Sequence, residues 1–133
     1  FWNFDFSVAT GLNGETTGLG DFTFKLLIDT DVTAATNYVE LTLVPENPLL
    51  PGPLGSDSDF VWAAPGGTPV LIDDDEGVPG LVTQNSGNYA FYGLPDYNAG
   101  TGFAGLAIFD IQLQAYDGAE LIGVNHVVVE VVL

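Results

Sequence analysis

Two groups of acidic residues in this sequence have residue types and spacing suited to chemistry. One is a run of four consecutive carboxylates directly after a strand-like segment, and the other flanks an expected turn after a second such segment. Calcium takes about six to eight oxygen ligands, which crowded loop carboxylates supply together with carbonyls and water. We therefore predict calcium as the candidate cofactor; the alternative is solvated turn residues that keep the protein soluble. The candidate ligands are Asp29, Asp31, Asp73, Asp74, Asp75 and Glu76.

No arrangement of residues predicts catalysis. The only histidine, His126, lies in a run of valines, and the sequence has no glycine motif of a nucleophile elbow. Carboxylates for glycoside hydrolysis are numerous but have no fixed spacing, and no glycine-rich stretch follows a strand and opens a helix to bind phosphate. The absence of cysteine excludes thiol chemistry and disulfides. We therefore predict that the protein is not an enzyme.

The charge balance excludes whole classes of partner. Across 133 residues, 18 Asp and Glu stand against one basic residue, Lys25, and the formal net charge is −17. Nucleic acid and anionic membranes require several Lys or Arg side chains, so neither is an expected partner. No apolar run is long enough to span a bilayer as a helix. Such a surface suits surroundings rich in screening or divalent ions, and an apolar content of 47% indicates a folded domain.

Alternation with a period of two is the main structural signal. In four segments every second residue is apolar and the residues between are mostly polar, which is the pattern of a strand that covers a core. The predicted core-facing residues are Trp2, Phe4, Phe6, Val8, Phe22, Phe24, Leu26, Ile28, Val39, Leu41, Leu43, Ala107, Phe109, Ile111, Leu113 and Ala115.

Turn residues fill the intervals, among them Asp117-Gly118, which predicts a tight hairpin. No segment shows a helical period. We therefore predict an all-β fold, a two-sheet β-sandwich of the immunoglobulin-like or jelly-roll-like kind with about seven to nine strands. Residues 1–133 are expected to form a single domain with a long Pro/Gly-rich loop around 45–68.

The last segment, 126–133, is apolar on both faces except at His126 and Glu130. It is therefore either a central buried strand or a strand that another molecule covers. Exposed aromatic residues would suit stacking on sugar rings, although core packing is their more frequent use. The candidates for stacking are Trp62, Tyr89, Phe91, Tyr92 and Tyr97.

Four stretches of the chain share a pattern with a known group of proteins. They are 1–8, 21–31, 82–86, of which Thr83-Gln84-Asn85-Ser86 is the most distinctive part, and the hairpin from Phe109 to Val129. In these stretches the chain resembles bacterial exported proteins with a PEP-CTERM sorting signal. The resemblance implies export by a signal peptide and a C-terminal Pro-Glu-Pro signal with a membrane segment, handled by an exosortase and expected from about Leu133. It also implies an extracellular, matrix-associated β-protein with no known catalysis.

The function expected from these observations is that of a secreted structural protein. We expect it to assemble with copies of itself into a filament or a surface or biofilm matrix, by addition of its first or last strand to a neighbouring subunit. The alternative, from a different class, is an extracellular module that binds polysaccharide or calcium.

Overall fold

A computed structural model of the protein describes residues 3–10, 17–31, 33, 35–45, 60–66, 68–72, 82–88 and 107–131. Within these residues the regular structure consists of eight β-strands and one short 3-10 turn, η1. The elements are β1 (Asn3–Ala9), η1 (Leu19–Asp21), β2 (Thr23–Asp29), β3 (Tyr38–Pro45), β4 (Phe60–Ala64), β5 (Thr68–Ile72), β6 (Val82–Asn88), β7 (Ala107–Asp117) and β8 (Glu120–Val131). The predicted all-β class and strand number are confirmed.

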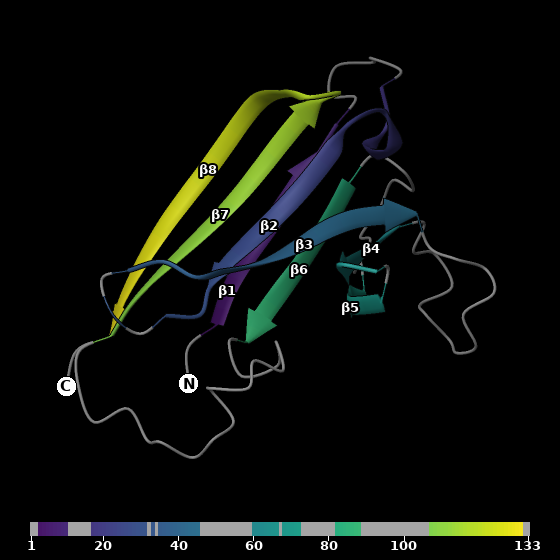
Figure 1. Ribbon diagram of the computed structural model, residues 1–133. Coiled ribbons are helices and arrows are strands. Elements are labelled where there is room, and N and C mark those ends of the chain that lie inside the picture. Colours follow the sequence, from purple (N-terminus) through teal and green to yellow (C-terminus); the bar gives the residue numbers. More distant parts are fainter. Residues whose placement is uncertain are drawn as a thin grey trace.

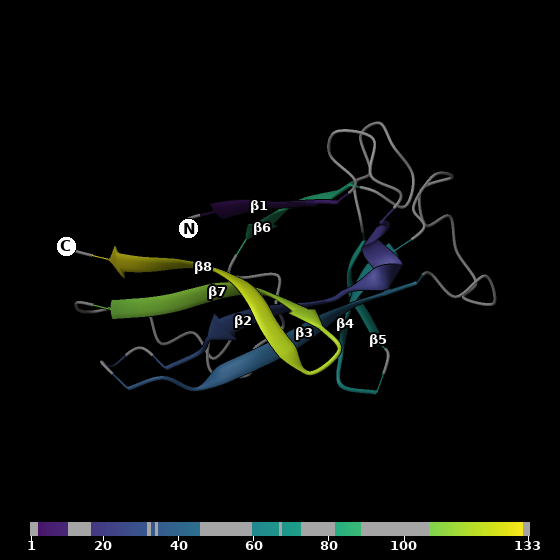
Figure 2. The same ribbon diagram turned by 90° about the horizontal axis from the view of Figure 1, so that it is seen from above.

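The strands form two antiparallel sheets. The larger sheet has the order β5-β4-β3-β2-β7-β8, and the smaller sheet pairs β1 with β6. In Figure 1 the larger sheet lies in front of β1 and β6, and Figure 2 shows the two sheets as separate layers. The predicted two-sheet sandwich is therefore confirmed.

The core lies between the sheets, where their alternating apolar residues meet. The edge of the Phe6 ring on β1 meets the Trp62 ring on β4, with ring centroids 5.4 Å apart and an interplanar angle of 87°. Side chains of the predicted set that are buried, or partly buried against the core, are Phe4, Phe6, Val8, Phe22, Phe24, Leu26, Ile28, Val39, Leu41, Leu43, Phe109, Ile111, Leu113 and Ala115. Trp2 and the side chain of Ala107 lie outside the described residues.

The predicted long loop needs a correction. Strand β4, Phe60–Ala64, lies inside the range 45–68 and pairs with both β3 and β5. The segment Phe60-Val61-Trp62 is aromatic and β-branched, which favours a strand, and the Trp62 side chain is fully buried. The loop prediction is therefore wrong for residues 60–64, whereas 46–59 lie outside the described residues.

Strand β8 lies at an edge of the larger sheet and pairs with β7. The predicted tight turn joins the two strands, since Asp117 is the Cα partner of Glu120 and Gly118 has a φ of 56°. This left-handed conformation at the first turn residue is one that glycine adopts without a Cβ clash. Of the two alternatives for the last segment, the central buried strand is excluded by this edge position.

Candidate functional site

The acidic pair at the end of β2, Asp29 and Asp31, holds a turn in place. Asp29, only 2% exposed, accepts hydrogen bonds at Oδ1 from the backbone N–H groups of Asp31 (3.0 Å) and Asn37 (2.8 Å). Asp31 in turn accepts one at Oδ1 from the N–H of Thr33 (2.8 Å). Hydrogen bonds from the side chain and backbone of Thr33 lower the pKa of Asp31. Both carboxylates thus hold the chain in the side-chain-to-backbone turns typical of Asp.

The calcium prediction gains no support from this geometry. The described residues contain no group of three or more His, Cys, Asp or Glu side chains placed to hold a metal ion. The other candidate ligands, Asp73, Asp74, Asp75 and Glu76, lie outside the described residues. Calcium binding therefore stays a prediction.

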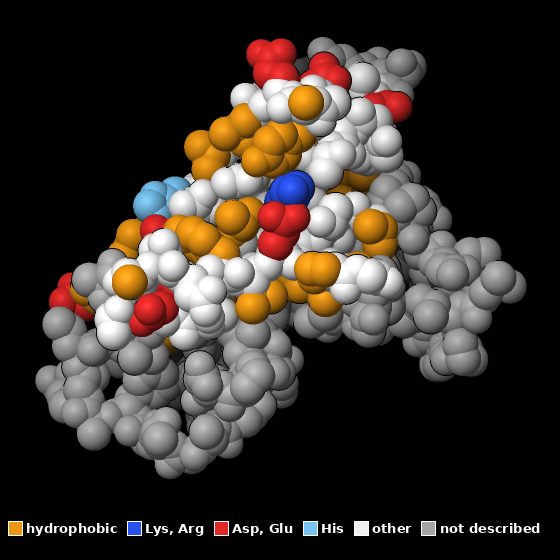
Figure 3. Space-filling model, viewed as in Figure 1, with side chains coloured by type: hydrophobic (Ala, Val, Ile, Leu, Met, Phe, Trp, Pro, Cys, Tyr) orange, Lys and Arg blue, Asp and Glu red, His pale blue; other side chains and the backbone are white. Residues whose placement is uncertain are grey.

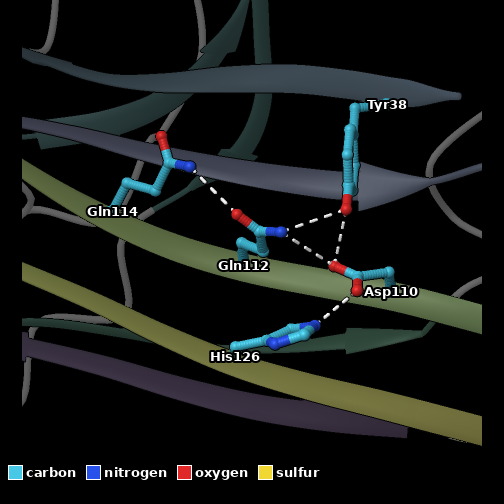
Figure 4. A network of polar contacts seen from close by, with 5 residues as sticks. All are labelled: Tyr38, Asp110, Gln112, Gln114 and His126. Carbon is cyan, nitrogen blue, oxygen red and sulfur yellow. Dashed lines mark hydrogen bonds and ion pairs between the residues drawn. The ribbon is translucent and has the colours of Figure 1, made fainter. Parts of the chain in front are cut away.

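A row of polar side chains runs along the outer face of the larger sheet (Figure 4). The Tyr38 hydroxyl donates to Asp110 Oδ1 at 2.7 Å, and Gln112 Nε2 donates to the Tyr38 oxygen at 3.0 Å. Gln114 Nε2 donates to Gln112 Oε1 at 3.0 Å, and the Tyr116 hydroxyl donates to Gln114 Oε1 at 2.7 Å. The alternation along β7 predicts that Asp110, Gln112 and Gln114 face away from the core, but it carries no signal for the bonds between them.

Tyr38 spans the sheet at one end of this row. It is the Cα partner of Asp29 on β2, yet its hydroxyl reaches Asp110 on β7, so its ring crosses β2. Burial, followed by the hydrogen bond with Asp110, raises the pKa of Tyr38 to about 12. Partial burial opposes ionisation of Asp110, but hydrogen bonds from Tyr38, His126 and Gln112 outweigh it and lower the pKa of this carboxyl.

The only lysine and the only histidine of the chain lie on this same outer face. Lys25 Nζ pairs with Glu40 Oε1 at 2.8 Å and lies 5.6 Å from the centroid of the Tyr116 ring. The hydrogen bond to Glu40 raises the pKa of Lys25. His126 Nε2 contacts Asp110 Oδ2 across the β7–β8 pair. Each basic side chain is therefore held by a carboxylate.

The edge strand β8 carries the exposed large apolar residues of the described chain. It exposes Leu121 by 49%, Ile122 by 52%, Val124 by 58%, Val127 by 51% and Val128 by 55%. Figure 3 shows apolar side chains over the β7–β8 hairpin, with the histidine at the same margin of the sheet.

These exposed valines lie on both faces of β8. Val124 and Val128 are the partners of the outward-facing Gln114 and Asp110, whereas Val127 is the partner of the inward-facing Ile111. Sequence reasoning found the two-faced apolar pattern, but exposure follows from the edge position, which the pattern alone leaves open.

A cavity of about 180 Å³ lies between β1 and the inner face of β2, β7 and β8. Four consecutive β1 residues, 4–7, line one side, and Leu113, Asn125 and Val127 are among the residues opposite. Because consecutive strand residues point to opposite faces, a cavity that touches all four lies along the edge of β1. The apolar surface around β8 therefore continues inward beside β1.

Trp62 is fully buried, which removes it from the candidates for sugar stacking. The other candidates, Tyr89, Phe91, Tyr92 and Tyr97, lie outside the described residues.

Among the described residues, no helix has the length and apolar character needed to cross a membrane. Comparison with protein-family models, with curated proteins and with solved structures found no match for this chain.

Proposed function

We propose that the protein is an extracellular structural subunit that assembles with copies of itself through its edge strand β8. The observation that carries the proposal is the exposure of five large apolar side chains along this strand, each at about half of its surface. Addition of a strand from another subunit would cover these side chains and satisfy the outward backbone groups of the edge. Units joined through β8 would associate by further contacts into a filament or a surface or biofilm matrix.

The two edges of the larger sheet differ in a way that supports this proposal. Strand β5 at the opposite edge has five residues and includes Pro69. Short edges and proline are devices that prevent edge-to-edge pairing. Strand β8 has twelve residues, and its stretch 121–129 contains no Pro, Asp, Glu, Lys or Arg. Among the described strands, the larger sheet is thus protected at its β5 edge and open to pairing at its β8 edge.

The net charge also favours β8 as the contact. Copies that each carry a charge of −17 repel one another, so a contact between them costs least where carboxylates are sparse. The stretch 121–129 meets this condition. Ions at high concentration screen the remaining repulsion, which agrees with assembly in ion-rich surroundings outside the cell.

The test is the assembly state of the full chain at high ionic strength, measured by analytical ultracentrifugation and negative-stain electron microscopy. We expect assembly for the natural chain and its loss in Val128→Glu, because the new carboxylate lies on the exposed edge. The matched control is Ala119→Glu, which adds the same charge at an exposed position of the hairpin turn. A natural chain that stays monomeric, or equal assembly of both variants, would contradict the proposal.

A further inference from the structure

We propose that β8 pairs with β8 of a second copy, antiparallel about a twofold axis at Val128, so that two larger sheets join into one. This inference rests on the proposed function and adds the partner strand, its direction and its register. A paired unit of this kind has a self-complementary contact and would be the building block of larger assemblies.

The outer edge of β8, which pairs with no other strand among the described residues, sets the direction of pairing. Strand β8 pairs with β7 on one side, from Glu120 opposite Asp117 to Val131 opposite Ala107. In an antiparallel ladder, alternate residues direct their N–H and C=O groups to the other side, which here is the outer edge. An identical strand related by a twofold axis can bond these groups only in antiparallel direction.

The alternation of faces restricts the register. Residues directly opposite each other in an antiparallel pair point to the same face of the sheet. Within the regular part of β8, even-numbered residues point outward: Val124, His126, Val128 and Glu130 are partners of Gln114, Gln112, Asp110 and Ile108. A residue must therefore lie opposite a residue of the same face. The twofold axis then passes midway between the two copies of one residue, and we name the axis after that residue.

The positions of His126 and Glu130 select one register among those in which the axis lies at a residue of β8. With the axis at Val128, His126 lies opposite Glu130 of the second copy, and symmetry repeats this pair on the other side of the axis. Moving the axis by one residue, to Val127 or Val129, instead places Glu130 opposite a valine. An axis at His126 places two imidazoles opposite each other. Only the first of these registers places a basic side chain opposite the Glu130 carboxylate, and like or unpaired charges there are unfavourable.

The surroundings of His126 fit this role. Its Nε2 contacts Asp110 Oδ2, which fixes the ring on the outer face, and 47% of its side chain is exposed. Because Nε2 contacts Asp110, Nδ1 is the ring nitrogen that remains for a second carboxylate. The other basic side chain, Lys25, lies on β2 in the interior of the sheet and pairs with Glu40. His126 is therefore the basic side chain that a second copy can reach at this edge.

Disulfide cross-linking tests the register directly, because the natural chain has no cysteine. In the proposed pairing only residue 128 lies opposite itself, with Cα atoms about 4.5–5.5 Å apart, a separation that a disulfide spans. We expect Val128→Cys to form a covalent dimer rapidly under mild oxidation, and Val127→Cys and Val129→Cys to do so slowly when each is alone. A mixture of the last two variants should cross-link, since these positions lie opposite each other.

A double-mutant cycle tests the charge pair. Within one chain, His126 and Glu130 are four strand residues apart, about 13 Å, so they have no direct contact. We expect His126→Gln and Glu130→Gln each to weaken dimerisation by about tenfold, and the double variant to weaken it by about the same factor.

The outcomes separate the two proposals. Faster cross-linking of Val127→Cys or Val129→Cys alone, or independent effects of the two Gln substitutions, would overturn the register while leaving assembly through β8 intact. A natural chain that remains monomeric in the same buffer would overturn both.

Discussion

The Tyr38 hydroxyl on β3 donates a hydrogen bond to Asp110 on β7 over a distance of 2.7 Å, although β2 lies between these strands. The contact joins residues that are 72 positions apart in the sequence. Through Asp110 it continues to His126 on β8. One chain of polar contacts thus connects the middle of the larger sheet to its edge strand β8.

The raised pKa of Tyr38 predicts sensitivity to alkali. A group whose pKa rises on folding to about 12, from 10.0, stabilises the fold fully below about pH 10 and loses this contribution as the pH approaches 12. We expect the free energy of unfolding to fall over this interval. In Tyr38→Phe the fall should be smaller, with a cost of about 1 kcal/mol at neutral pH for the lost hydrogen bond.

Denaturant unfolding at several pH values measures both effects, and ultraviolet absorbance of tyrosinate follows the ionisation. The other tyrosines are common to both proteins, so the difference between the two proteins isolates Tyr38. Equal alkaline loss in both would show that the hydroxyl of Tyr38 does not contribute.

The face assignment of β7 predicts unequal costs for two substitutions. Phe109 is fully buried, so Phe109→Ala should destabilise the protein by about 3–5 kcal/mol through lost burial and a cavity. Gln112 lies on the outer face, so Gln112→Ala should cost only about 1 kcal/mol through its hydrogen bonds. Chemical denaturation of both variants measures the difference, and equal costs would contradict the assignment.

The faces of individual strands could be predicted from sequence because alternation is local. Phe24, Leu26 and Ile28 are buried as their spacing predicts. The pairing of β2 with β7 and of β1 with β6 could not be predicted in this way, because it joins segments far apart in the chain. The edge position of β8, and with it the exposure of Val127 and Val128, follows from that pairing.

Competing local signals explain the error at β4. Proline and glycine dominate the composition of residues 45–68 and indicate a loop. Burial of Trp62 against Phe6 outweighs that preference for the short segment Phe60–Ala64. The polar row was missed for a related reason, since the contact between Tyr38 and Asp110 depends on strand order.

The role of Asp29 in its turn predicts a stability effect. Its carboxylate accepts hydrogen bonds from two backbone N–H groups while only 2% of the residue is exposed. Asp29→Ala leaves both donors without this acceptor, and we expect a loss of about 1–3 kcal/mol. Asp29→Asn keeps one side-chain carbonyl oxygen and should cost less. Thermal unfolding ranks the two variants, and a cost for Asn equal to that for Ala would mean that the acceptor is not what matters.

Calcium dependence is the last prediction, and it separates specific binding from screening. If the acidic run 73–76 binds calcium, saturating calcium should raise the unfolding midpoint above the midpoint in sodium chloride of equal ionic strength. The difference should correspond to roughly a few kcal/mol of added stability. Substitution of Asp74 and Asp75 by Asn should abolish this difference. Asp29→Asn should leave it unchanged, because the Asp29 oxygen already accepts backbone hydrogen bonds. Identical midpoints in calcium and in sodium chloride would leave charge screening as the whole effect of the ion.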